Sequence, residues 1–105
     1  MIEVTEQTRS GWCVLGVSGR ADAETAAELE SRLRGAVENH PQVAVDFSAL
    51  AYISSAGIRA VLQAARAAQE GKVEFAVCAP SAPVRKVFDM SGLDHILTIH
   101  GELPC

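Results

Sequence analysis

Aromatic residues are scarce in this sequence, at 5% of 105 positions. Its core must therefore be aliphatic, and few rings remain to stack on the bases of single-stranded nucleic acid. Basic residues are also sparse, since 9 lysines and arginines stand against 13 aspartates and glutamates, for a formal net charge of -4. No run of Lys or Arg offsets this charge, so a phosphate backbone would be repelled. We therefore expect no direct binding of nucleic acid.

Cysteine is limited to three widely spaced residues, Cys13, Cys78 and Cys105. The odd count and the spacing argue against a disulfide framework and a zinc site. Cys13 and Cys78 stand among apolar neighbours, where a buried thiol is expected, and Cys105 is expected to be a free thiol in a loose tail. We therefore expect no metal, no cofactor and a reducing cytoplasmic location.

Long hydrophobic runs are missing as well. No stretch approaches the roughly 18 apolar residues that a membrane-spanning helix needs, and the first ten residues lack the apolar core of a signal peptide. We expect no membrane insertion. Hydrophobic residues still make up 49% of the chain, which is enough for one core, so residues 1–105 are predicted to form a single domain.

Strand and helix patterns alternate along the chain. Alternating and continuous apolar runs predict strands at residues 2–7, 12–18, 43–47, 73–78 and 96–99, the last at a sheet edge. Helices are predicted from an Asp22 N-cap to Asn39, from Ser54 or Ser55 to Glu70, and from Ser81 to Gly92, with residues 48–53 as a connection. This β-β-α-β-α-β-α-β order predicts an α/β domain with a mixed, mostly parallel sheet and helices packed mainly on one face.

The most informative segment is residues 45–58, which runs from the carboxyl end of a strand to the start of the second predicted helix. Unpaired backbone N–H groups and the helix dipole favour negative charge at such a place. A phosphoserine there brings a charge of about -1.5 to -2 without disturbing the fold. Ser54 and Ser55 are equally suited to plain helix capping, and spacing alone does not separate the two roles.

The segment Asp46-Phe47-Ser48, followed by Tyr52-Ile53-Ser54-Ser55-Ala56-Gly57-Ile58, resembles the signature of the STAS domain family, the anti-sigma factor antagonists in particular. Two further matches lie in the expected places, Gly19-Arg20-Ala21-Asp22 before the first helix and Val87-Phe88-Asp89-Met90-Ser91-Gly92-Leu93 at the last one. The resemblance covers nearly the whole chain.

This resemblance implies a regulatory role. Such proteins, when unphosphorylated, bind a serine kinase that doubles as an anti-sigma factor, and they release it when that kinase phosphorylates a serine at the start of the second helix. A serine phosphatase restores binding. Ser55 matches the phosphorylated serine. The family often has Asp where this chain has Ser54, and Ser or Thr where it has Ala56, so Ser54 is the second choice of acceptor.

The partner-binding residues expected from this comparison are Asp22, Ser54, Ser55, Ala56, Gly57, Arg59 and Arg66. Arg59 and Arg66 are seven positions apart and share one helix face, which is also compatible with a merely solvated face. Asp22 is equally explained by capping alone. Asp46 is expected to tie down the loop that follows it through backbone N–H groups.

The sequence also bears on two other functions. A hydrolase nucleophile elbow needs Gly-x-Ser-x-Gly, but Ile53 occupies the leading position before Ser55, so no enzyme activity is expected. The family resemblance also allows an accessory subunit of a membrane transport system for lipids or anions. A serine retained at position 55 favours the phosphorylation switch over that alternative.

Overall fold

The computed structural model describes residues 1–91 and 99–100. Its strands are β1 (Ile2–Arg9), β2 (Trp12–Ala21), β3 (Gln42–Asp46), β4 (Leu50–Ile53), β5 (Glu74–Cys78) and β6 (Ile99–His100). Its helices are α1 (Ala26–Asn39), α2 (Ser55–Glu70) and α3 (Ala82–Ser91). The predicted α/β class and element order are confirmed, with one strand added.

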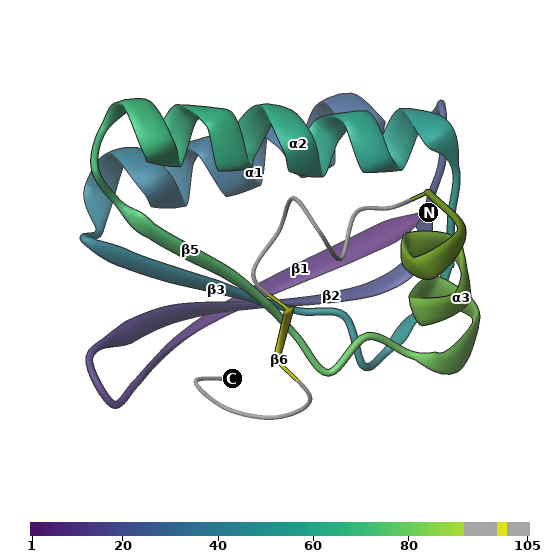
Figure 1. Ribbon diagram of the computed structural model, residues 1–105, viewed down its shortest axis with the longest axis horizontal. Coiled ribbons are helices and arrows are strands. Elements are labelled where there is room, and N and C mark those ends of the chain that lie inside the picture. Colours follow the sequence, from purple (N-terminus) through teal and green to yellow (C-terminus); the bar gives the residue numbers. More distant parts are fainter. Residues whose placement is uncertain (92–98, 101–105) are drawn as a thin grey trace.

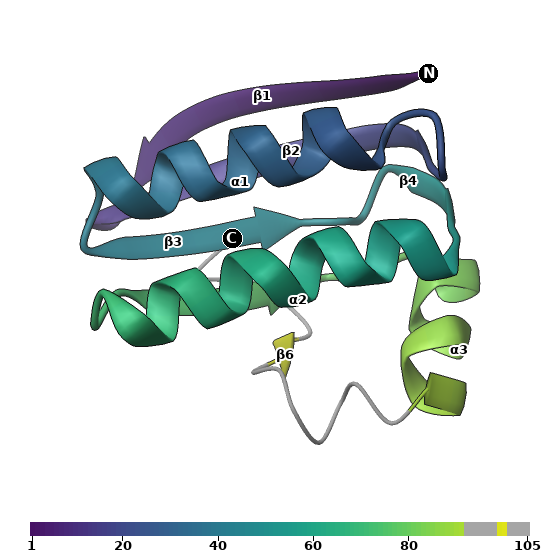
Figure 2. The same cartoon turned by 90° about the horizontal axis from the view of Figure 1, so that it is seen from above.

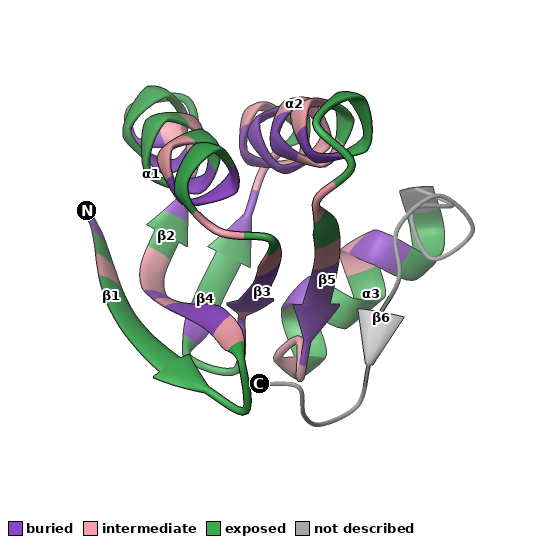
Figure 3. Ribbon diagram, turned by 90° about the vertical axis from the view of Figure 1, so that its left-hand side faces the viewer, coloured by how far each residue is buried: buried purple, intermediate pink, exposed green. Residues whose placement is uncertain are grey.

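The strands form a mixed sheet in the order β1-β2-β3-β5-β6, and β4 pairs separately with β2. β1 runs antiparallel to β2 in a hairpin, whereas every other pairing is parallel. Helices α1 and α2 lie side by side on one face of this sheet, and α3 stands at the end where β4 lies (Figures 1, 2 and 3). The prediction that the helices pack mainly on one face is therefore confirmed.

The main core lies between the sheet and the two long helices. Its fully buried side chains are aliphatic with two exceptions, Phe47 and Phe88, whose rings meet edge to face with centroids 6.1 Å apart. Helix α1 turns one apolar stripe to the core: Leu29, Leu33 and Val37 are buried, and partly buried Ala26 packs against the same core. A second, smaller cluster of Val14, Ala44 and Cys78 belongs to the alternate strand positions, which point to the opposite face of the sheet.

The connection predicted for residues 48–53 is wrong, since residues 50–53 form strand β4. Its burial pattern explains the error: Leu50 and Ile53 are buried while the two residues between them are exposed. A strand is recognised in a sequence by alternation with a period of two, and this strand lacks it. A shift of register between Gly19 and Arg20 of β2 accompanies the pairing.

The carboxyl-terminal prediction is tested only in part. β6 pairs with β5 at the sheet edge, as expected for the end of the predicted strand 96–99, but residues 96–98 and the predicted loose tail lie outside the described residues. In the part of the chain that is described, no helix combines the length and the hydropathy needed to cross a membrane.

The cysteines differ from expectation at one position. Cys13 is a buried free thiol, as predicted. Cys78 is buried but disulfide-bonded, so the expectation of a plain buried thiol is wrong there. Disulfides depend on how the fold places two Cα atoms, which sequence spacing does not reveal. Cys105 lies outside the described residues.

Candidate functional site

Strand β4 places the start of α2 beside the end of β2. Arg20 and Ala21 pair with Tyr52 and Ile53, and the Ser54 N–H donates to the Ala21 carbonyl at 2.8 Å. Helix α2 begins one residue later, at Ser55. The predicted site residues around position 55 are therefore brought next to the turn that carries Asp22.

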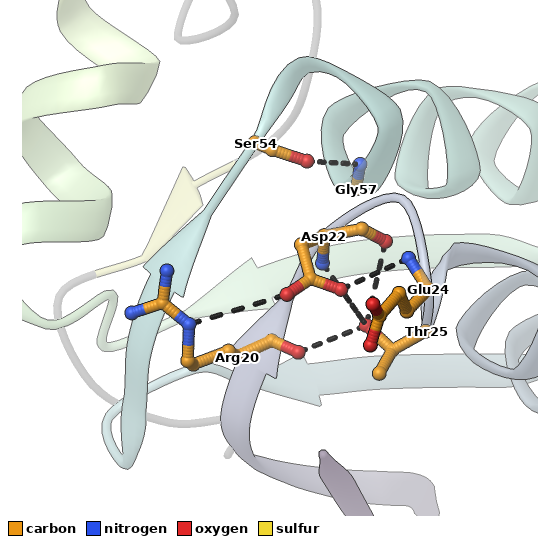
Figure 4. A network of polar contacts seen from close by, with 6 residues as sticks. All are labelled: Arg20, Asp22, Glu24, Thr25, Ser54 and Gly57. Atoms are coloured by element: carbon orange, nitrogen blue, oxygen red, sulfur yellow. Dashed lines mark hydrogen bonds and ion pairs between the residues drawn. The ribbon is translucent and has the colours of Figure 1, made fainter.

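The two adjacent serines occupy different positions. Ser54 is the N-cap of α2, with extended backbone, and its hydroxyl accepts the N–H of Gly57 at 3.4 Å (Figure 4). Ser55 is the first helical residue and is exposed. A cap requires only one serine. Ser55 is therefore not needed as a cap, and it is exposed at a helix N-terminus, where anions are favoured.

Gly57 lets the helix start approach β2 closely. A Cβ at this position would lie 2.8 Å from the Ala21 carbonyl oxygen and 2.9 Å from a methylene carbon of Ile53. Gly57 is itself buried, and Ala56 is half-buried. Contacts within the protein therefore explain why a glycine occupies this position.

Asp22 lies in the β2–α1 turn, so the prediction that it is the N-cap of α1 is wrong. The helix starts at Ala26, after Thr25. The Asp22 carboxylate instead accepts the Glu24 N–H at 3.0 Å, a bond of the same kind made in an extra turn before the helix (Figure 4). Because Asp favours both caps and turns for this reason, its identity alone did not locate the helix start.

Thr25 holds this turn together and was missed by the sequence analysis. Its hydroxyl donates to the Arg20 carbonyl at 2.9 Å and accepts the Asp22 N–H at 3.0 Å. Thr25 is the one polar residue buried in the described part of the chain. These bonds fix the position of Asp22 relative to the end of β2.

Arg20 and Tyr52 form a second feature that sequence reasoning missed. The Arg20 guanidinium lies over the Tyr52 ring, 4.4 Å from its centroid, and its Nε is 4.0 Å from an Asp22 carboxylate oxygen. Their pairing in the β2–β4 register explains the stack. Since β4 was not predicted, nothing in the sequence indicated that these side chains are neighbours. Tyr52 is 39% exposed.

Arg59 and Arg66 lie exposed on the same side of α2 as Ser55. Ser55 and Arg59 are four residues apart, which places them one above the other on a helix, and Arg66 follows after seven more. No ion pair involves either arginine within the described residues. Both charges are therefore available to solvent along one exposed stripe that begins at Ser55.

Asp46 acts as predicted. Its carboxylate accepts the Ser48 N–H at 2.9 Å and so anchors the loop between β3 and β4.

In the described residues, no hydrogen bond joins the Ser55 hydroxyl to a histidine or a carboxylate. Within the described part of the chain, the exposed Ser55 therefore lacks the adjacent base that activates a catalytic serine.

Comparison with known proteins gives a consistent result. The family model described as Mlab, STAS domain, matches residues 4–99. The anti-sigma-F factor antagonist RsfB of Mycobacterium tuberculosis is 30% identical over 103 residues, which are 97% of this chain and 84% of that protein.

Solved structures share the fold. The crystal structure of an anti-sigma factor antagonist from Mycobacterium paratuberculosis superposes with a TM-score of 0.88 at 25% identity, covering 98% of this chain and 88% of that one. The Bacillus anti-sigma factor antagonist SpoIIAA, solved in unphosphorylated and phosphorylated forms, gives TM-scores of 0.73 and 0.69 at 23% and 22% identity. Both forms cover 94% of this chain, and the chain covers 87% and 90% of them.

Proposed function

We propose, since the chain belongs to the STAS domain family, that it is an anti-sigma factor antagonist and that phosphorylation of Ser55 controls its binding to a serine kinase. Its relative RsfB bears the name anti-sigma-F factor antagonist, and the role is regulatory rather than enzymatic. Unphosphorylated protein binds the anti-sigma factor kinase, phosphorylated protein releases it, and a serine phosphatase restores binding.

The observation that carries the proposal is the different structural roles of Ser54 and Ser55. Ser54 uses its hydroxyl to cap α2, whereas Ser55 is exposed at the first helical position. A kinase needs an accessible hydroxyl, and Ser55 offers one without loss of the cap. This supports Ser55 over Ser54 as the acceptor. SpoIIAA, which has the same fold, has been solved phosphorylated.

The surface around Ser55 suits a switch based on charge. Arg59 lies one helical turn along the exposed stripe, and the Arg20–Asp22 pair lies across the β2–α1 turn. A phosphate of about -1.5 to -2 charge at Ser55 would attract the Arg20 and Arg59 guanidinium groups and repel the Asp22 carboxylate. A partner that contacts the same groups would then meet an altered potential, and like charges across an interface oppose binding.

The partner-binding surface follows from these positions. Asp22, Ser54, Ser55, Ala56, Arg59 and Arg66 form the proposed contact region, and buried Gly57 acts by keeping α2 close to β2. Arg20 and Tyr52 extend the region with an exposed cation–aromatic stack. Tyr and Arg are among the residues most enriched at interface hot spots.

The test begins with the Ser55→Ala variant as bait in lysate of the source cells, followed by binding measurements with the purified kinase. The Ser55→Ala variant and the unphosphorylated protein without a substitution are both expected to bind the kinase. Ser55→Glu is expected to bind at least about tenfold more weakly, equivalent to 1.4 kcal/mol. Ser10→Glu adds the same charge in the β1–β2 turn and is expected to bind normally.

Two results would count against the switch. Equal kinase binding by Ser55→Glu and Ser55→Ala would remove Ser55 as its control point. Capture of a permease and its ATPase, with no kinase, would instead support the accessory subunit of a lipid or anion transport system.

A further inference from the structure

Three side chains of different chemistry meet at the end of the molecule away from the start of α2. They are Glu6 on β1, Cys13 on β2 and His40 at the end of α1. One ligand-type atom from each, a carboxylate oxygen, Sγ and an imidazole nitrogen, lies within 4.8 Å of the other two. His40 Nε2 lies 3.9 Å from a Glu6 carboxylate oxygen.

The fold rather than the sequence brings these groups together. The β1–β2 register pairs Thr8 with Cys13 and Glu6 with Leu15, so alternation places the Glu6 and Cys13 side chains on the same face. That face is the one covered by α1, whose end reaches the hairpin end of the sheet (Figure 2). His40 is extended at the helix end, as a residue before proline favours.

The protein alone gives the Cys13 thiol of this cluster no bonding partner within the described residues. Cys13 is 3% exposed and forms no disulfide, and no hydrogen bond to its sulfur occurs among the described residues. A cation held between the Cys13 sulfur and the Glu6 carboxylate would give this buried sulfur a bonding partner.

We propose that Glu6, Cys13 and His40 form a zinc-binding site with a fourth position open to water. Sulfur, nitrogen and carboxylate oxygen are the ligands zinc takes, at about 2.0–2.3 Å each, and three protein ligands leave one position free. On binding, Cys13 gives its proton to solvent as the sulfur–zinc bond forms. Tetrahedral ligands lie about 3.3–3.8 Å apart at those bond lengths, so the cluster must contract by roughly 1 Å.

Movement of that size is available at the two outer ligands. The side chains of Glu6 and His40 are 51% and 35% exposed, so both can reorient without disturbing the core. The site is separate from Ser55, and the proposal does not rest on the function proposed above.

The test uses the full chain, free of any polyhistidine tag, titrated with Co²⁺ as a spectroscopic probe. We expect one Co²⁺ per chain, visible absorption typical of a tetrahedral site with a thiolate ligand, and displacement by Zn²⁺. Glu6→Gln and His40→Gln should each weaken Co²⁺ binding by at least about tenfold. Even substitution of a residue that only hydrogen-bonds to a metal ligand weakens metal binding by that factor. Glu3→Gln, on the same strand but the other face, should not weaken Co²⁺ binding.

Cys13→Ser should abolish the thiolate–cobalt absorption, and the two surface variants keep the test decisive if Cys13→Ser fails to fold. Zn²⁺ should also raise the melting temperature of the unmodified protein but not that of His40→Gln. The proposal is overturned if the unmodified protein binds no Co²⁺ at micromolar concentration, or if its binding is indifferent to both Glu6→Gln and His40→Gln.

Discussion

At the scale of single residues, the adjacent serines Ser54 and Ser55 have different structural roles. Ser54 is hydrogen-bonded to Gly57 through its side chain and to Ala21 through its backbone, whereas Ser55 is exposed. The sequence resemblance indicated Ser55, but it left both serines open as caps. The hydrogen bond of Ser54 is what separates their structural roles.

Stability measurements should therefore distinguish the two. Ser54→Ala removes a capping side chain and should lower the free energy of unfolding by about 0.5–1 kcal/mol. Ser55→Ala should stay within about 0.5 kcal/mol of the unmodified protein. Urea denaturation followed by circular dichroism measures both. Equal losses for the two variants would contradict the assignment of Ser54 as the cap.

A methyl group at Gly57 should destabilise the domain. The Ala21 carbonyl oxygen in its way already accepts the Ser54 N–H, so it cannot move cheaply, and Gly57→Ala should cost about 1–3 kcal/mol. Gly35→Ala is the matched control, because a Cβ there meets nothing within 4 Å. That helix-interior change should instead stabilise by about 0.5–1 kcal/mol. A neutral Gly57→Ala in urea denaturation would refute the close approach.

Some site residues could not have been found from the sequence. Thr25, Arg20 and Tyr52 owe their roles to the turn geometry and to the β2–β4 register, neither of which leaves a periodic pattern. Asp46 was predictable because its bond to Ser48 is local. No motif spacing predicts the cluster of Glu6, Cys13 and His40, because it depends on three elements packing together.

At the scale of elements, the long helices and central strands were predictable because each carries an apolar stripe or a continuous apolar run. β4 was not, since its buried residues do not alternate. The start of α1 was placed too early because the Asp22 carboxylate makes a cap-like bond in a turn before the helix. These two errors both fall where the chain passes the candidate site.

The end of α2 offers a direct test at this scale. Lys72 has a φ of 58°, its N–H donates to the Gln69 carbonyl, and the next N–H donates to Ala68, which is the pattern of a Schellman motif. Glycine is the favoured residue at this left-handed position, so Lys72→Gly should stabilise by about 0.5–1 kcal/mol.

The same substitution inside a helix provides the control for Lys72. Lys86→Gly, at an exposed position within α3, should lower the free energy of unfolding by about 1 kcal/mol. Thermal or urea unfolding of both variants gives the comparison. Destabilisation by Lys72→Gly comparable to that by Lys86→Gly would show that the left-handed conformation is not present.

The exposed stripe of α2 should contribute to partner binding and little to stability. Arg59→Glu should weaken kinase binding by about tenfold or more, with the melting temperature nearly unchanged because Arg59 is exposed and makes no ion pair in the described part of the chain. Arg9→Glu reverses the same charge at the far end of β1 (Figure 1) and should bind normally. A large loss of stability in Arg59→Glu would make that arginine structural.

At the scale of the whole molecule, the packed core and the proposed phosphorylation site are kept apart. The core lies between the sheet and the long helices (Figure 3). Ser55, the first residue of α2, is exposed. The α/β class and mixed sheet were predictable from the alternation of strand and helix patterns. The disulfide at Cys78 was not, because a covalent pairing depends on the final geometry.

Negative charge at Ser55 should leave this architecture intact. Placed at the N-terminus of α2, the charge of Ser55→Glu should be neutral or stabilising by up to about 1 kcal/mol. Gln69→Glu places the same charge in the last turn of α2 and should destabilise by a similar amount. Circular dichroism and thermal unfolding measure both. A marked loss of structure in Ser55→Glu would mean that phosphorylation acts by unfolding rather than by changing a surface.

The most direct measurement of the central claim is phosphosite mapping of the protein after incubation with its kinase and ATP. Fragmentation mass spectrometry should place a single phosphate on Ser55, and the Ser55→Ala variant should remain unmodified while Ser54→Ala is phosphorylated. A phosphate found on Ser54 alone, or no phosphate at all, would contradict the assignment of Ser55 as the switch.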